Sequence, residues 1–151
     1  MDHKAISAQV LVEHEMLTHI TSALRTILDW KSQDYDLSRK LGSLRFSAQS
    51  YQRHLERLMA LEEHDGYMDA IVAAQPKLVK QVEDLRKEHD DFRRQLNRLV
   101  ARLENVSPTD REKFAAISTE LAELLNKVDE HSACETDLLQ EAFLRDEGGE
   151  E

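Results

Sequence analysis

The sequence has few residues that interrupt helices. Its 151 residues include only four glycines and two prolines, Pro76 and Pro108. Sandwiches and barrels need a turn signal about every 8–12 residues, so this shortage argues against an all-β fold. Instead it predicts long helices in a chain long enough for one domain.

Cysteine and long apolar runs are also scarce. A single cysteine, Cys134, cannot form an intrachain disulfide, which fits a reducing cytoplasm. No stretch approaches the roughly 18 apolar residues of a membrane span, and the N-terminus has no apolar block of signal-peptide length. We therefore expect a soluble, cytoplasmic protein that does not bind membranes.

Basic residues are outnumbered by acidic ones. Lys and Arg total 20 and Asp and Glu total 30, which gives a net charge of −10. Such a charge repels phosphate backbones and anionic lipid headgroups. Nucleic acid and membrane surfaces are thus poor candidate partners.

The apolar residues recur at the three- and four-residue spacing of amphipathic helices. Long helices are predicted over 3–30, 37–65 and 76–105, with a short helical bridge over 67–74. The last long helix follows the break at 107–110, where we expect Ser107 to be the N-cap. Four such helices predict an all-α, up-down-up-down four-helix bundle over residues 1–145, followed by an acidic, frayed tail at 146–151.

Polar residues replace aliphatic ones at a few positions of these apolar stripes. One occurs in each of the first three long helices and two in the fourth, and each should point into the bundle: His14, Glu62, His89, His131 and Glu135. A lone inward histidine is usually a core residue with its hydrogen bonds satisfied. A buried carboxylate, however, must be neutralised by a partner or a proton. Two carboxylates and three imidazoles directed at one interior therefore indicate a bound divalent cation.

The residues around these positions are expected to have ordinary roles. Glu63 has two possible roles, a hydrogen-bond acceptor behind a ligand or a surface residue, and we favour the surface. The mixed charges from Glu83 to Arg94 are expected to form a solvated, salt-bridged face. Cys134 neighbours Glu135, and a buried structural cysteine is the commoner case for such a position than a redox-active thiol. No nucleophile triad, phosphate-binding loop or paired-cysteine motif supports a hydrolase, a kinase or a zinc ribbon.

The order of short motifs resembles the hemerythrin-like family, also called the HHE cation-binding domain. The matching pieces follow one another along nearly the whole chain: Glu13-His14, Leu61-Glu62-Glu63, Glu88-His89 and His131-x-x-x-Glu135. This resemblance implies a four-helix bundle that holds a pair of non-heme iron ions through histidines and carboxylates.

One position departs from the family pattern. The family's second helix has a histidine four residues before its glutamate, whereas this chain has Leu58 four residues before Glu62. His54 lies one turn earlier and would serve as a ligand if the helix were shifted by a turn. Three outcomes stay open: a site that recruits His54, a site with fewer ligands or a single ion, and a former site that binds no metal.

The leading functional hypothesis is therefore a cytoplasmic protein that binds non-heme iron and interacts with oxygen, nitric oxide or iron itself, in binding, storage or sensing. The alternative is a degenerate, metal-free bundle that acts as an interaction or sensory module, and Leu58 is its main support. An oxidase or peroxidase using the same centre ranks below both, because related bundles perform different tasks with similar ligands.

Overall fold

The computed structural model describes residues 3–31, 37–64 and 67–144, and these residues are almost entirely helical. The α-helices are α1 (His3–Asp29), α2 (Ser38–His64), α3 (Tyr67–Ala74), α4 (Val79–Asn105) and α5 (Arg111–Leu139). A 3₁₀ turn at Pro76–Leu78 precedes α4, and a π-helical turn at Gln140–Leu144 follows α5. The all-helical prediction is confirmed, with five α-helices in the described part of the chain because the bridge at 67–74 is a helix in its own right.

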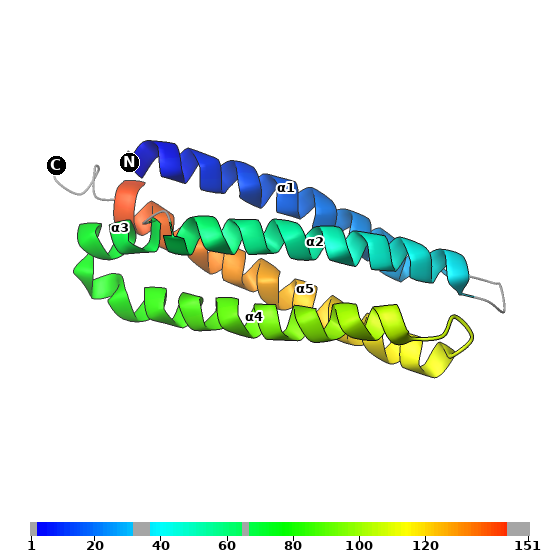
Figure 1. Ribbon diagram of the computed structural model, residues 1–151. Coiled ribbons are helices and arrows are strands. Elements are labelled where there is room, and N and C mark those ends of the chain that lie inside the picture. Colours follow the sequence, from blue (N-terminus) through cyan, green and yellow to red (C-terminus); the bar gives the residue numbers. More distant parts are fainter. Residues whose placement is uncertain (1–2, 32–36, 65–66, 145–151) are drawn as a thin grey trace.

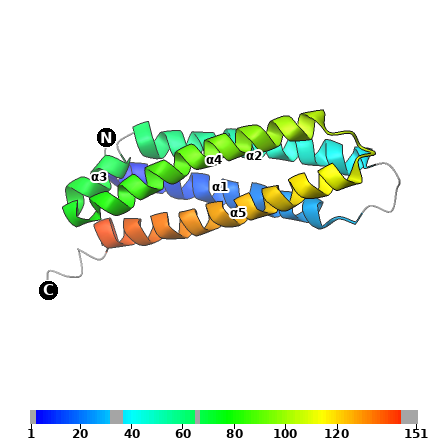
Figure 2. The same ribbon diagram turned by 90° about the horizontal axis from the view of Figure 1, so that it is seen from below.

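The four long helices lie side by side along the length of the molecule (Figure 1). Helix α1 packs against α2 and α5, and α4 packs against α2 and α5, so the four enclose one interior (Figure 2). The short helix α3 contacts α1, α2 and α4 at the end where α2 finishes and α4 begins. This end of the bundle is therefore closed by an additional helix.

The core follows the apolar spacing of the sequence. In α4 the buried positions recur every three or four residues, at Val82, Leu85, His89, Phe92, Leu96, Leu99 and Leu103. This periodicity places one side of the helix against the other three. His89 therefore lies within the apolar stripe, as its spacing predicts.

The helices are interrupted where the sequence predicts breaks, at Pro76 and before α5, but the predicted N-cap of α5 differs from the observed one. Pro76 begins the 3₁₀ turn before α4, where its missing N–H group is not needed. The predicted N-cap of α5 was wrong: Asp110 accepts a hydrogen bond from the Lys113 amide at 3.1 Å. Ser107 lies in the turn before it, where its carbonyl accepts from the Asp110 amide at 3.0 Å. The chain thus completes one more turn before the helix starts. The predicted acidic tail at 146–151 lies outside the described residues.

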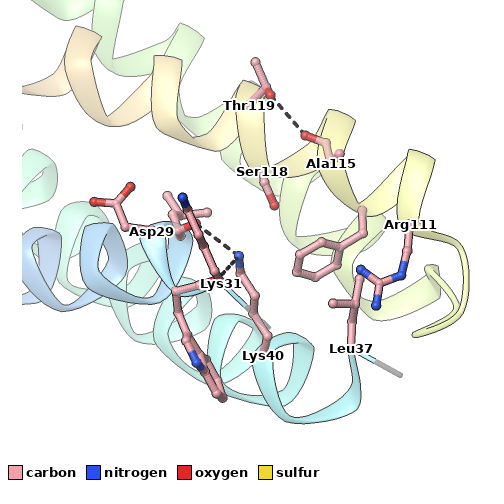
Figure 3. Close-up of a pocket in the computed structure, with 11 residues that line it drawn as sticks. Asp29, Lys31, Leu37, Lys40, Arg111, Ala115, Ser118 and Thr119 are labelled. Carbon is pink, nitrogen blue, oxygen red and sulfur yellow. Dashed lines mark hydrogen bonds between the residues drawn. The ribbon is translucent and has the colours of Figure 1, made fainter. Parts of the chain in front are cut away.

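A hollow of about 640 Å³ lies at the far end of the bundle from α3 (Figure 3). Its most buried cation, Lys40, donates hydrogen bonds to the carbonyls of Leu28 (3.1 Å) and Trp30 (2.7 Å). Burial lowers the pKa of Lys40, an effect that Asp29 partly offsets. Lys40 therefore satisfies the carbonyl groups at the end of α1, and none of the predicted site residues lines this hollow.

No helix in the described ranges is long and apolar enough to cross a bilayer.

Candidate metal centre

Five predicted site residues converge in the interior near the α3 end of the bundle. They come from all four long helices: His14 from α1, Glu62 from α2, His89 from α4, and His131 and Glu135 from α5. Glu62 and His89 are 0% exposed, Glu135 is 2% exposed and His131 is 5% exposed. His14 is the most accessible of the five, with 16% of its side chain exposed. The packing of four helices thus brings together residues that are up to 121 positions apart in sequence.

The first group of candidate ligands consists of His89, His131 and Glu135, whose ligand atoms all lie within 4.8 Å of one another. The Nε2 atom of His89 lies 3.0 Å from Nε2 of His131 and 3.3 Å from Oε1 of Glu135. His131 and Glu135 are one helical turn apart on α5, and Nε2 of His131 also contacts Oε1 of Glu135. Two nitrogens and one oxygen therefore face a common point.

The second group consists of His14, Glu62 and again Glu135. The Nε2 atom of His14 lies 3.2 Å from Oε2 of Glu135. Because Oε1 of Glu135 faces His89 and His131, the two oxygens of this carboxylate face different groups. Glu135 is thus shared between two neighbouring sets of donors.

Glu62 is buried without a hydrogen-bond partner. Both of its carboxyl oxygens are inaccessible, and neither has a partner among the described residues. Burial, and next the negative charge of Glu135, raise the pKa of Glu62 well above its usual range. A carboxyl group in this position requires either a proton or a cation beside it.

The pKa of Glu135 shifts in the opposite direction, below its usual range. Burial by itself would raise the pKa of Glu135, but the adjacent Glu62 carboxyl, which takes the proton of the pair, and the three histidines hold it well below its usual range. The two pKa values shift in opposite directions, which favours the proton of the pair on Glu62 and the negative charge on Glu135.

The outer nitrogens of two histidines also contact carboxylates. Nδ1 of His89 lies 3.2 Å from Oε2 of Glu63, and Nδ1 of His131 lies 3.1 Å from Oε2 of Glu88. The prediction that Glu63 is a surface residue was wrong, because it lies between His89 and Arg93. Glu88 was likewise assigned to the solvated face, and it is 46% exposed while contacting His131. Their positions next to Glu62 and His89 in sequence are the only signal that could have singled them out.

These contacts test whether the residues fit a metal ion. An ionised carboxylate can only accept a hydrogen bond, so in the tautomer whose Nδ1 donates to Glu63 or Glu88 each neutral ring presents a lone pair at Nε2, as a metal ion requires. Two such lone pairs face each other at 3.0 Å, which requires a proton or a metal cation between them. Burial would lower the pKa of His131, but Glu135 and Glu88 raise it overall, which favours a proton at this point in the absence of metal. The imidazole and carboxylate donors suit iron, manganese or zinc.

The surroundings of the centre are apolar and aromatic. The ring of Phe92 meets that of His131 edge to face, with centroids 5.2 Å apart. Tyr67 of α3 is 2% exposed, and burial together with the negative charges of Glu135 and Glu62 raises its pKa. Sequence analysis did not single out Tyr67, because its approach to the site depends on how α3 folds across the bundle.

The position that departs from the family pattern lies in the core. Leu58 is 2% exposed on α2. His54, one turn earlier, is half-buried, and its Nδ1 atom is buried without a hydrogen-bond partner among the described residues. It belongs to neither group of candidate ligands, so its role as a ligand stays a prediction. Cys134, expected to be buried, is exposed, because it lies about 100° around α5 from Glu135.

Comparison with known proteins was made at the level of families, curated sequences and solved structures. Residues 5–143 match the family model described as the hemerythrin HHE cation binding domain. No curated protein and no solved structure matches the chain. The family match covers all five converging residues and confirms the resemblance inferred from the short motifs.

Proposed function

Since the chain belongs to the hemerythrin HHE cation-binding family, we propose that His14, Glu62, His89, His131 and Glu135 would hold two non-heme iron ions, with Glu135 belonging to both groups of ligands. The observation that supports this most directly is the division of Glu135: one oxygen faces His89 and His131, and the other faces His14. We also infer that the long helices alternate in direction, up-down-up-down, since this brings His14 early in α1 level with Glu62 late in α2.

The proposed activity is reversible interaction with oxygen, nitric oxide or iron itself in the cytoplasm. Iron held by nitrogen and carboxylate donors provides open coordination positions for such small molecules. The two candidate ligand groups comprise five residues, and Leu58 stands where the family has a histidine, so a bound metal would have room for such a small molecule. The protein would therefore bind, store or sense iron or these small molecules at the metal centre itself, without a separate substrate pocket.

The chain's own residues define the environment of this centre. Phe92, which packs against His131, and Tyr67, which lies near Glu135 and Glu62, are buried and would keep water from the centre. Glu63 and Glu88 keep the protons of two histidines on their outer nitrogens, so that the inner nitrogens are free to bind. His14 is the most exposed candidate ligand, and a small molecule would enter on its side.

Metal analysis after expression with added iron tests the proposal. We expect about two iron ions per chain, as the two ligand groups that share Glu135 require, and a visible spectrum that changes on exposure to oxygen or nitric oxide. His89→Ala and Glu135→Ala should both lose the metal while remaining helical by circular dichroism. A wild-type protein that stays colourless and metal-free under these conditions would refute the proposal.

The buried Leu58 favours a second candidate, a metal-free bundle that acts as an interaction or sensory module. In that case, added Fe²⁺ would leave the melting temperature of the wild type unchanged, and His89→Ala would shift it equally with and without the ion. A stabilisation by Fe²⁺ that disappears in His89→Ala would exclude this candidate.

A further inference from the structure

The two histidines of the first ligand group are held from outside by carboxylates in very different surroundings. Glu63, which contacts Nδ1 of His89, has only 17% of its side chain exposed. Glu88, which contacts Nδ1 of His131, is 46% exposed. The two hydrogen bonds have nearly equal lengths of 3.2 and 3.1 Å. They differ in the solvent exposure of the carboxylate and not in their length.

Glu63 is fixed by an arginine and Glu88 is not. The Nη2 atom of Arg93 donates to both oxygens of Glu63, at 2.7 and 3.0 Å. Arg93 is itself held by Glu56 at 2.9 Å and Asp90 at 3.1 Å. Among the described residues, the ion pair of Glu88 is with His131 alone. Glu63 is therefore oriented by a network and Glu88 by a single contact beside solvent.

The position of Arg93 makes this network specific to His89. Arg93 follows His89 by one helical turn on α4, while Glu63 comes from α2, so the arrangement connects two helices beside one candidate ligand. A carboxylate with both oxygens bound by a guanidinium cannot rotate away from the imidazole without breaking charge-assisted hydrogen bonds. Exposed ion pairs of the kind available to Glu88 are weak by comparison.

We propose that Glu63 and Arg93 form a positioning pair that keeps the proton of His89 on Nδ1 and directs its Nε2 lone pair to the metal centre. This inference rests on the proposed function, since the lone pair has a use only if a cation binds there. It assigns unequal roles to the two outer carboxylates: Glu63 fixes the tautomer and orientation of His89, whereas Glu88 holds His131 less firmly. Outer partners of this kind change metal affinity by about 10- to 100-fold.

The test compares Glu63→Gln and Arg93→Gln with the matched control Glu88→Gln. Each Glu→Gln replacement keeps the size of the side chain, whereas Arg93→Gln shortens it. All three positions are at least partly exposed, so helical content should be unchanged. Fe²⁺ affinity is measured by chelator competition without oxygen. We expect Glu63→Gln and Arg93→Gln to weaken binding by about 10- to 100-fold and Glu88→Gln by less than about fivefold.

A second measurement does not require metal. The ¹⁵N shifts of the imidazole nitrogens report which nitrogen is protonated, and metal-free wild type should show His89 with its proton on Nδ1. In Glu63→Gln and Arg93→Gln this preference should become a mixture of tautomers. Equal effects of Glu63→Gln and Glu88→Gln on affinity, or an unchanged His89 tautomer in both test variants, would overturn the positioning pair. If the wild type binds no iron, the proposed function fails, while the tautomer shift by itself still decides the inference.

Discussion

Glu62 should make the metal-free protein less stable and the metal-bound protein more stable. Its side chain is 0% exposed and neither carboxyl oxygen has a hydrogen-bond partner among the described residues, although Nε2 of His89 lies 3.8 Å from Oε1. A buried polar group without a hydrogen bond costs roughly 1–3 kcal/mol. Glu62→Met removes this cost with a side chain of similar length that packs well among apolar neighbours.

The magnitude translates into a measurable change in melting temperature. For a chain of about 150 residues, 1 kcal/mol corresponds to roughly 2–4 °C, so Glu62→Met should raise the metal-free value by about 3–10 °C. With iron at about 100 times its dissociation constant, the wild type gains roughly 2.7 kcal/mol. The variant should lose most of that gain, because the second ligand group loses its only unshared carboxylate.

Differential scanning fluorimetry with a chelator, and then with Fe²⁺ under nitrogen, measures both effects. Glu15→Met serves as the control, because Glu15 is exposed on α1 and should shift neither value by more than about 1 °C, as expected of a surface change. The reasoning is refuted if Glu62→Met lowers the metal-free melting temperature, or if Fe²⁺ stabilises variant and wild type equally.

Four further predictions concern pH, proton release, Leu58 and the start of α5. The pKa values of Glu62 and His131 are raised in the folded protein. Because the unfolded chain releases these protons at lower pH, the metal-free protein should lose stability as pH rises from about 5 to 8. Urea unfolding at several pH values measures this, and a rise in stability would contradict it. For the same reason Fe²⁺ binding should release protons, which calorimetry in two buffers of different ionisation enthalpy detects as different apparent heats. Leu58→His should destabilise the metal-free protein by roughly 1–3 kcal/mol, because it places an imidazole at a position that is 2% exposed. If the new imidazole binds Fe²⁺, the ion should restore the lost stability. A loss that Fe²⁺ does not restore would show that the imidazole does not bind the ion. Asp110→Ala should lower the free energy of unfolding by about 1 kcal/mol, because it removes the N-cap of α5. Ser107→Ala should lower it by less, and the reverse order would contradict the assignment of Asp110 as the N-cap.

Much of the fold could be predicted because helix formation depends on local spacing. The predicted ranges 3–30 and 67–74 correspond to α1 at His3–Asp29 and α3 at Tyr67–Ala74. The error at Ser107 has a local cause too, since both Ser107 and Asp110 are good N-caps and the choice depends on how the turn before α5 closes.

The candidate ligands were predictable for a related reason. His89 interrupts an apolar stripe, and a residue in such a stripe points inward wherever the helix packs. Glu63 gave no such signal, because a residue next to an inward position faces sideways and its contacts depend on the neighbouring helix. The same limit applies to Cys134, whose exposure depends on how closely α4 approaches that side of α5.

The amino-acid sequence was sufficient to predict long amphipathic helices with three histidines and two glutamates facing their interior. Both follow from the 3.6-residue period of the helix, which fixes direction around the axis. The sharing of Glu135 between two ligand groups and the contact of Glu63 with His89 could be seen only in the folded molecule. These depend on the axial positions of one helix against another, where a shift of one turn moves a side chain by about 5.4 Å, and such positions are set by the packing of all four helices together.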